Sequence, residues 1–388
     1  MSQSFDEITA QLKRRHRKSA RLKWMSMGAL ILAATFLVVF IGDMLVKGLP
    51  AFQQAQIQVE VSYTEQARQI PPAAVDDEVR QLVSRGYLRL IPGRMEDNPE
   101  LLGTTRMEWV LADAEVDQYL KGHYSRLSDK HKRVVDELAE DGRAELMFNT
   151  RFFTTGDSKM PELAGIAAAA MGTVLTLIVT MAVCFPIGVM TAVYLEEFAP
   201  DNRLTQIIEI NINNLAAVPS ILFGLLGLAI YINFFGVPRS TPLVGGLTLA
   251  LMTLPVIIIA TRTALRSVPD TIRQAAFGVG CSRWQVVRDH VLPLSLPGIL
   301  TGSIIGLAQA MGETAPLIII GMVAFIPDVP TSFTEPATVL PAQIFTWAGE
   351  PERAFIEKTA GGILVLLTVL ISLNASAVWL RKKFERRW

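Results

Sequence analysis

A carboxylate, Glu313, lies in the middle of a long apolar stretch of the sequence. Within a membrane a carboxylate is costly and normally faces the protein interior or a water-filled path. Gly312 and Pro316 bracket it, and because Pro316 lacks an N–H, a carbonyl one turn earlier is left free to line a cavity. Gln309 and Thr314 add neutral polar groups. We expect Glu313 to be either a residue of a translocation path or a tie between helices, and direct contact with an anion is disfavoured because like charges repel.

Proline also interrupts two other apolar runs, at Pro219 and at Pro255. Ser220 follows the first of these prolines, and Asn214 offers an amide near the cytoplasmic end of the same run. Broken helices can point their positive half-helix ends at an anion in the middle of a membrane. Arg262 follows the run that contains Pro255. We weigh two roles for it, attraction of a departing anion and anchoring at the membrane surface, and the second is favoured.

The segment 266–293 carries the signals of two short helices rather than those of an irregular loop. Ser267 is suited to cap the first helix. Ser282 and Gln285 form a capping-box pattern at the start of the second.

The ends of these two helices are also marked. Gly278 and Gly280 are expected to break the first helix and let the chain turn tightly, and Pro293 is expected to stop the second. The first helix presents a small apolar face that suits docking into a groove of a partner protein: Ile272, Ala275, Ala276 and Val279.

Three elements of this segment have the spacing of the EAA loop of ABC-importer permeases: Gln274-Ala275-Ala276, Gly280 and Leu292-Pro293. The chain resembles that family, with Gln274 in place of its Glu and His290 in place of its Ile. The resemblance implies that these six residues couple the chain to an ATPase: Gln274, Ala275, Ala276, Gly280, Leu292 and Pro293. The sequence contains no glycine-rich phosphate-binding loop of its own, so ATP hydrolysis is expected on a separate subunit.

Two further strings narrow the resemblance to the PstA-type permeases of phosphate importers: residues 214–225, NLAAVPSILFGL, and residues 311–316, MGETAP. The chain is also similar to the subgroup that carries an extra outward domain after the first span. It departs from the family at Gln309, where an arginine is often found. The resemblance and the residues together give these candidates for the path: Glu313, Gln309, Thr314, Ser220, Asn214 and Arg262.

The resemblance further implies an assembly in which this chain is not an enzyme. Its expected partners are a homologous second permease subunit, a dimer of cytoplasmic ATPases, a periplasmic phosphate-binding protein and the membrane lipid. No cofactor is expected on this chain, since ATP and Mg²⁺ belong to the partner ATPase. No nucleic acid is expected as a partner.

The candidate path and coupling residues must be positioned by the apolar stretches of the sequence. Six such stretches lack Asp, Glu, Lys and Arg for about the length of a membrane-crossing helix: 24–42, 163–195, 210–238, 240–261, 291–312 and 359–380. Only helices suit such runs, because lipid cannot satisfy exposed backbone groups. The predicted fold class is an all-α polytopic membrane protein with six transmembrane helices and a small outward-facing soluble domain. By resemblance its core is that of a type I ABC importer permease.

Basic residues set the expected orientation. Seven Lys or Arg lie at 13–23, five at 262–288 and five at 381–387. Positive charge marks the cytoplasmic side, so both termini are expected in the cytoplasm of a bacterium, with the chain in its inner membrane. A cleaved signal peptide is rejected, because the first apolar run is long and no small-x-small site follows it at 43–50.

The expected division of the chain has four parts, and the coupling loop 266–293 lies within the last of them: a basic cytoplasmic tail 1–23, a first transmembrane helix 24–46, a periplasmic domain 47–160 and a five-helix permease core 161–388. Apolar spacing within the periplasmic domain predicts helices over 76–90, 107–123 and 130–147, in a small helical or mixed fold. The domain holds 19 acidic and 15 basic residues, so it has no positive field to attract phosphate.

Three alternatives remain at this point. The first is a permease for sulfate, molybdate or another small oxyanion. The second is a membrane-anchored receptor, which predicts an output domain that does not follow the last apolar run. The third, a membrane enzyme, is disfavoured because no nucleophile, base and metal-ligand set converges in the sequence, whose two cysteines are isolated.

Overall fold

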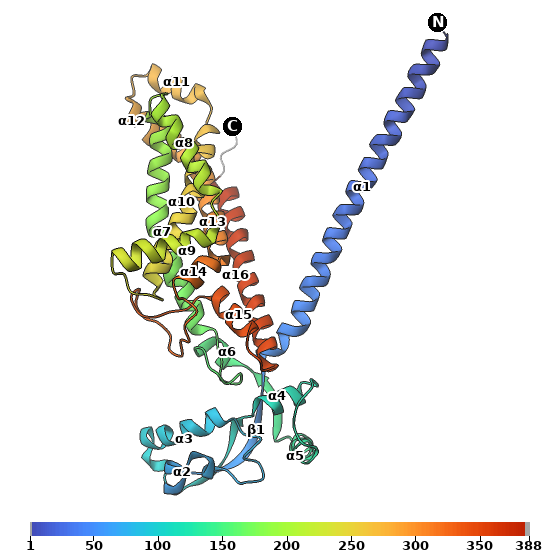
Figure 1. Ribbon diagram of the computed structural model, residues 1–388, viewed down its shortest axis with the longest axis vertical. Coiled ribbons are helices and arrows are strands. Elements are labelled where there is room, and N and C mark those ends of the chain that lie inside the picture. Colours follow the sequence, from blue (N-terminus) through green and yellow to red (C-terminus); the bar gives the residue numbers. More distant parts are fainter. Residues whose placement is uncertain (1, 385–388) are drawn as a thin grey trace.

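The computed structural model describes residues 2–384, so Met1 and residues 385–388, with the basic Arg386 and Arg387, lie outside the description. Figure 1 shows a long helical bundle with a smaller α/β unit at one end. The start of the first helix, the end of the last helix and two short helices lie at the other end of the molecule. These four are α1 (Ser2–Gly48), α16 (Ala354–Phe384), α11 (Asp270–Gly278) and α12 (Arg283–Gln285).

Among the described residues, five helices are long and apolar enough to cross a membrane: Arg14–Phe52, Ala167–Phe198, Pro242–Arg266, Arg283–Gly312 and Ala354–Lys383. Besides α1, α12 and α16 they contain η1 (Leu49–Phe52), α7 (Ala167–Val193), η4 (Tyr194–Phe198), α10 (Pro242–Arg266), η6 (Val286–Val291) and α13 (Leu292–Gly312). Five of the six predicted runs lie in these helices. The interruption expected at Pro255 is wrong, because α10 is continuous through it.

The remaining predicted run, 210–238, is not one straight span. It is divided between α8 (Arg203–Ala216) and α9 (Ser220–Leu226), which continues as η5 (Gly227–Phe234), and the two parts meet at 104°. Pro219 causes the break, since it has no N–H to donate and disfavours helical geometry at Val218 before it. The interruption predicted at Pro219 and Ser220 is therefore present, as a sharp bend.

Small residues bring the core helices α7, α10 and α13 close together. A Cβ built on Gly246 of α10 would lie 2.4 Å from Cβ of Val179 on α7, and one on Gly302 of α13 would lie 2.4 Å from Cβ of Ala260 on α10. Close backbone approach through Gly, Ala and Thr is typical of helices packed within a membrane. The short α14 (Ala315–Ile319) and α15 (Leu340–Ala348) complete this half of the structure.

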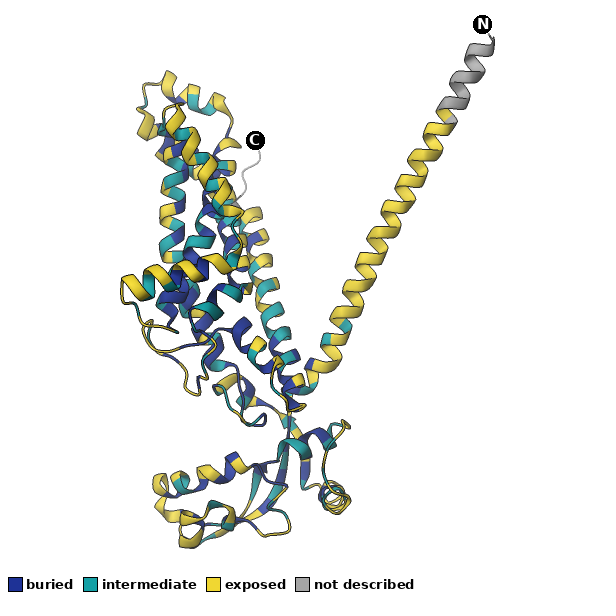
Figure 2. Cartoon of the chain, in the orientation of Figure 1, coloured by how far each residue is buried: buried dark blue, intermediate teal, exposed yellow. Residues whose placement is uncertain are grey.

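Helix α1 diverges from the bundle. It contacts α16 near its end, where a Cβ on Gly48 would lie 2.6 Å from Leu364. Along most of its described length its apolar residues are exposed, and the cartoon of the helix is coloured yellow for exposed residues in Figure 2. Such a helix needs an apolar environment, which the hydrocarbon of a bilayer provides.

The α/β unit between α1 and α7 is built on a three-stranded antiparallel sheet in the order β2-β1-β3. In β1, Ala55, Ile57, Val59 and Val61 alternate with polar residues and are buried, so one face of the sheet covers the core. The elements of the unit are β1 (Gln53–Ser62), α2 (Glu65–Gln69), η2 (Pro71–Ala74), α3 (Arg85–Asp97), η3 (Pro99–Leu101), β2 (Thr105–Leu111), α4 (Ala114–Leu120), α5 (Asp129–Glu140), β3 (Ala144–Phe148) and α6 (Thr150–Thr154).

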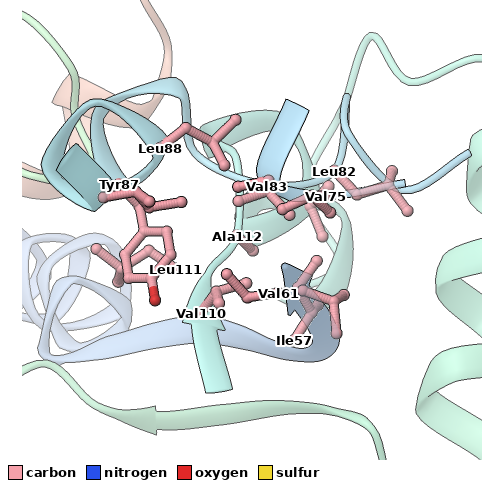
Figure 3. Packing of buried hydrophobic residues seen from close by; sticks show 14 of the residues in the cluster. Ile57, Val61, Val75, Leu82, Val83, Tyr87, Leu88, Val110, Leu111 and Ala112 are labelled. Atoms are coloured by element: carbon pink, nitrogen blue, oxygen red, sulfur yellow. The ribbon is translucent and has the colours of Figure 1, made fainter. Parts of the chain in front are cut away.

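The core of this unit lies between the sheet and α3. Figure 3 shows Ile57 and Val61 from β1 and Val110 and Leu111 from β2 facing Tyr87 and Leu88 of α3. Central pairs are Ile57 with Val110 and Ile57 with Ala144, one on each side of β1. The unit therefore has a hydrophobic core of its own.

The helices predicted in this region are only partly correct. Helix is absent from 76–84 and begins at Arg85, and Pro92 lies inside α3 rather than ending it. The predicted helix 107–123 is half strand: β2 continues to Leu111, and α4 starts only after Asp113 accepts a hydrogen bond from the N–H of Glu115. The predicted helix 130–147 ends at Glu140, and β3 follows.

Candidate functional site

The predicted coupling loop forms a compact cap on the end of the core helices that lies away from the α/β unit (Figure 1). Helix α11 ends in two hydrogen bonds, from the N–H of Cys281 to the carbonyl of Ala276 (3.1 Å) and from the N–H of Gly280 to that of Phe277 (3.0 Å). Gly280 has φ of 88°, so this is a Schellman ending that favours glycine. The predicted tight turn at Gly280 is confirmed, whereas Gly278 is the last residue of the helix.

Two of the predicted helix signals in this loop differ in the structure. Pro269, not Ser267, precedes α11, and the hydroxyl of Ser267 donates to the carbonyl of Ala264 at the end of α10. The predicted capping box is present, with Ser282 and Gln285 each bonding the other's backbone. Pro293 does not stop the second helix, because η6 passes directly into α13 and Pro293 lies in its first turn, where a missing N–H is tolerated.

The six predicted coupling residues do not share one exposed face. Gln274, Ala275 and Gly280 are exposed on α11 and its turn. Ala276 is buried in the loop's own core, packed with Leu265, Val268, Val286 and Val291. Leu292 is half-buried and Pro293 is exposed at the start of α13. The surface open to a partner is thus formed by Gln274, Ala275 and the predicted Val279, together with two large apolar side chains that the sequence interpretation did not select, Phe277 and Trp284.

A network of ion pairs lies beneath this cap. Arg262 of α10 bonds Glu196 of η4 (3.2 Å) and Glu209 of α8 (2.7 Å), and Arg266 bonds the second oxygen of Glu196 (2.8 Å). Arg262 is therefore already paired with two carboxylates. Arg273 of α11 bonds the buried Glu197 (2.8 Å).

The sequence interpretation did not identify the acidic partners in this network. A signal was available, because Glu196 and Glu197 directly follow a long apolar run and three arginines recur after the fourth run. Together the ion pairs connect η4, α8, α10 and α11 at one end of the bundle.

The two interrupted helices lie against each other nearer the middle of the bundle. A Cβ on Gly224 of α9 would lie 2.7 Å from Cα of Pro316 in α14, so these helices are in backbone contact. Helix α13 ends at Gly312, Glu313 has extended backbone angles, and α14 begins at Ala315. The break expected around Glu313 is thus confirmed.

The predicted path residues are distributed around these two breaks. Ser220 begins α9 and is half-buried, whereas Asn214 near the end of α8 is exposed. Gln309, one turn before Glu313, is exposed, and Glu313 and Thr314 are half-buried. Within residues 2–384 the Glu313 carboxylate has no ion pair or hydrogen bond. Arg262 lies apart from this group, in the network of ion pairs beneath the loop 266–293.

A second buried ionic cluster, also absent from the sequence interpretation, joins the α/β unit to α16. The carboxylate of Glu357 accepts hydrogen bonds from Gln118 (2.7 Å) and Lys121 (2.9 Å) and contacts Nδ1 of His123 (2.7 Å). Lys121 also bonds Asp117 (2.6 Å), which accepts from the N–H of Ala55 in β1. Charged residues beside an apolar run were the available signal, since Glu357 and Lys358 precede the predicted sixth span.

Nearby, Glu162 is buried and accepts a hydrogen bond from the hydroxyl of Ser84 (2.6 Å). Burial raises the pKa of the Glu162 carboxyl above its ordinary value. Across the part of the chain that the structure describes, no group of three or more His, Cys, Asp or Glu side chains is arranged to hold a metal ion.

Residues 184–388 match the family model described as the binding-protein-dependent transport system inner membrane component, and residues 9–96 and 76–130 match a domain of unknown function, DUF3333. A probable ABC transporter permease protein of Bacillus subtilis, YqgI, is 31% identical over 252 residues, 62% of this chain and 85% of that protein. The phosphate transport system permease protein PstA 1 of Mycobacterium tuberculosis is 32% identical over 224 residues, 58% of this chain and 72% of that protein.

One solved structure, of inward-facing conformations of the MetNI methionine ABC transporter, is similar at 17% identity with a TM-score of 0.44, covering 55% of this chain and 92% of that one. The family assignment does not depend on this similarity. It rests on the family model, which spans the bent helix pair, the loop 266–293 and the break at Glu313. The chain belongs to the family of inner membrane components of binding-protein-dependent transport systems.

Proposed function

We propose that this chain is the permease subunit of an ATP-driven importer of inorganic phosphate and forms half of the path through the membrane. The observation that carries the proposal is the contact of two interrupted helices, α9 and α14, in a bundle whose cytoplasmic end is capped by a coupling loop. Relatives named phosphate transport permeases support phosphate as the substrate. Sulfate and molybdate are the alternatives to exclude.

The path is proposed to run beside the two breaks, where Ser220, Asn214, Gln309, Glu313 and Thr314 supply polar groups. Glu313 has no cation beside it within the described residues, and Gln309 is neutral. A phosphate anion next to an ionised Glu313 would be repelled. We therefore assign Glu313 a role in opening and closing the path rather than in binding the anion, and we expect a second permease subunit to supply the positive charge.

Coupling is proposed to occur through the loop 266–293. Its exposed Gln274, Ala275, Phe277 and Trp284 form a partly apolar surface that suits docking into a groove of an ATPase. In this proposal the ATPase dimer binds ATP and Mg²⁺, and this chain holds neither. A periplasmic binding protein delivers phosphate on the side of the α/β unit.

The orientation follows from the same proposal. The start of α1, the end of α16 and the loop 266–293 lie at one end of the molecule, and the α/β unit lies at the other (Figure 1). Basic residues are concentrated at the first end. We propose that this end, with both termini, is cytoplasmic.

Uptake of labelled phosphate tests the proposal in cells that lack other phosphate importers and express the complete complex. We expect uptake that unlabelled phosphate abolishes and that an equal excess of sulfate or molybdate leaves unchanged. Competition by sulfate or molybdate that equals competition by phosphate would contradict the assignment of the substrate. A matched strain without this chain provides the background.

A further inference from the structure

The guanidinium of Arg273 in α11 makes hydrogen bonds to four other residues. Its Nη2 donates to Oε1 of Glu197 (2.8 Å) and to the carbonyl of Leu265 (3.0 Å). Its Nη1 donates to the carbonyl of Val268 (2.7 Å) and to Oδ1 of Asp270 (3.2 Å). The hydrogen bond to Glu197 raises the pKa of the Arg273 guanidinium, so Arg273 keeps its charge. Arg273 therefore uses its planar fork on two carboxylates and two backbone carbonyls.

Asp270 belongs to α11 itself, and the other partners lie outside α11. Glu197 lies in η4, the last turns of the membrane-crossing helix Ala167–Phe198. Leu265 lies in the last turn of α10, where free carbonyls favour a cation, and Val268 lies in the connection to α11. One side chain of α11 thus contacts the cytoplasmic ends of two membrane-crossing helices.

The backbone alone would hold α11 less firmly. Three residues, Ser267 to Pro269, connect it to α10, and its other end is the turn at Gly280. The apolar contacts of Ala276 with Leu265 and Val286 hold one side of the helix. The side that faces α7 is held by Arg273 and Glu197, which are both largely shielded from solvent.

We propose that Arg273 is a positioning residue of the coupling loop. By bonding Glu197 and the carbonyls of Leu265 and Val268 it fixes α11 to α7 and α10, so that a push on α11 moves these membrane-crossing helices instead of bending the loop. The inference rests on the proposed function, since it assumes that an ATPase acts on α11. Arg273 itself need not touch the ATPase.

The test compares three variants in the purified complex. Arg273→Gln leaves Glu197 buried without its cation, so a loss of complex abundance is expected from that variant alone. Arg273→Gln combined with Glu197→Gln removes both charges, so abundance should recover while phosphate uptake per ATP hydrolysed stays reduced by at least about fivefold. Arg273→Lys keeps the charge without the fork and should be intermediate. Arg94→Gln, which breaks an Arg–Glu pair in the α/β unit, is the matched control and should couple normally.

A distance measurement gives a readout that does not depend on transport. Spin labels at Tyr194→Cys in η4 and Thr271→Cys in α11, both exposed positions, report the placement of α11 after Cys184 and Cys281 are replaced by Ser. We expect one narrow distance distribution with Arg273 and Glu197 present and a broad one in the double variant, with the ATPase still co-purifying.

Two results would overturn the positioning role: an unchanged distribution in the double variant, or coupling that recovers together with abundance. Failure of the proposed function is distinguishable from both. In that case the unmodified complex itself would transport no phosphate, while the distance distributions would still report whether Arg273 holds α11.

Discussion

Replacement of Gly280 by alanine isolates the backbone requirement of the coupling loop. Gly280 has φ of 88°, and nothing lies within 4 Å of a Cβ built on it, so Gly280→Ala introduces strain without a clash. A left-handed conformation costs an L-residue roughly 1–2 kcal/mol. A penalty of this size lowers the ratio of correctly closed to opened turns by a factor of about 5 to 30.

Gly278→Ala is a matched control. Nothing lies within 4 Å of its Cβ either, but its φ is not positive and it lies in the last turn of α11. Alanine there favours the helix by up to about 1 kcal/mol. Gly280→Asn should fall between the two, because asparagine tolerates the left-handed region better than alanine does.

The assay is phosphate uptake per ATP hydrolysed, measured with the amount of co-purified ATPase. We expect Gly280→Ala to lower this ratio severalfold at unchanged complex abundance, and Gly278→Ala to leave it unchanged. Equal coupling in the two alanine variants would refute the argument that the geometry of this turn transmits force. Loss of the ATPase from the complex in Gly280→Ala alone would show instead that the turn is needed for docking.

Three other changes test separate parts of the structure. Glu313→Gln should leave complex abundance normal and abolish phosphate uptake if the carboxylate acts on the path, whereas normal uptake would reduce it to a packing residue. Lys121→Met leaves Asp117 and Glu357 without their shared cation and should destabilise the junction with α16 by about 3–5 kcal/mol. The exposed control Lys159→Met should cost at most about 1 kcal/mol, and thermal unfolding of the complex measures both. Burial raises the folded pKa of Glu162, so its contribution to stability is present below the unfolded pKa and is lost as the pH rises through the folded pKa. Glu162→Gln should therefore raise the unfolding temperature at pH 8 but not at pH 4. An equal change in unfolding temperature at both pH values would contradict this reasoning.

The membrane-crossing helices could be predicted from the sequence because each is a long run without charge, and length and charge alone distinguish such runs. The bend of the third run could be placed at Pro219 for a local reason, since a missing N–H acts on its own helix. Its size of 104° could not, because it depends on packing of α9 against α14. Pro255 shows the converse: the same residue type in α10 is accommodated by a continuous helix.

The α/β unit was predicted less well. The alternation of Ala55, Ile57, Val59 and Val61 is a strand signal, but burial along β2 does not alternate, and β1, the strand with which β2 pairs, is far away in sequence. Pairing of two strands whose partner residues are 43 to 55 positions apart, as Ser62 with Thr105 and Gln56 with Leu111, cannot be derived from helical spacing within one segment.

In the candidate site, the local backbone features could be predicted from the sequence: the left-handed turn at Gly280 and the capping box of Ser282 with Gln285 are both present. The partners of Arg262 and Arg273 were not readable, because Glu196, Glu197 and Glu209 reach them only after α7, α8 and α10 pack. Burial of Ala276 inside the loop depends on the same packing.

ATP hydrolysis by the complete complex in liposomes tests the central claim most directly. The proposed complex contains this chain, a second permease and an ATPase dimer, and hydrolysis is followed with the phosphate-loaded binding protein on the side of the α/β unit. We predict hydrolysis that rises with loaded binding protein, is accompanied by labelled phosphate crossing the membrane, and is lost when this chain is omitted. Hydrolysis and phosphate movement that do not depend on each other in the intact complex would contradict the claim that this chain couples the two.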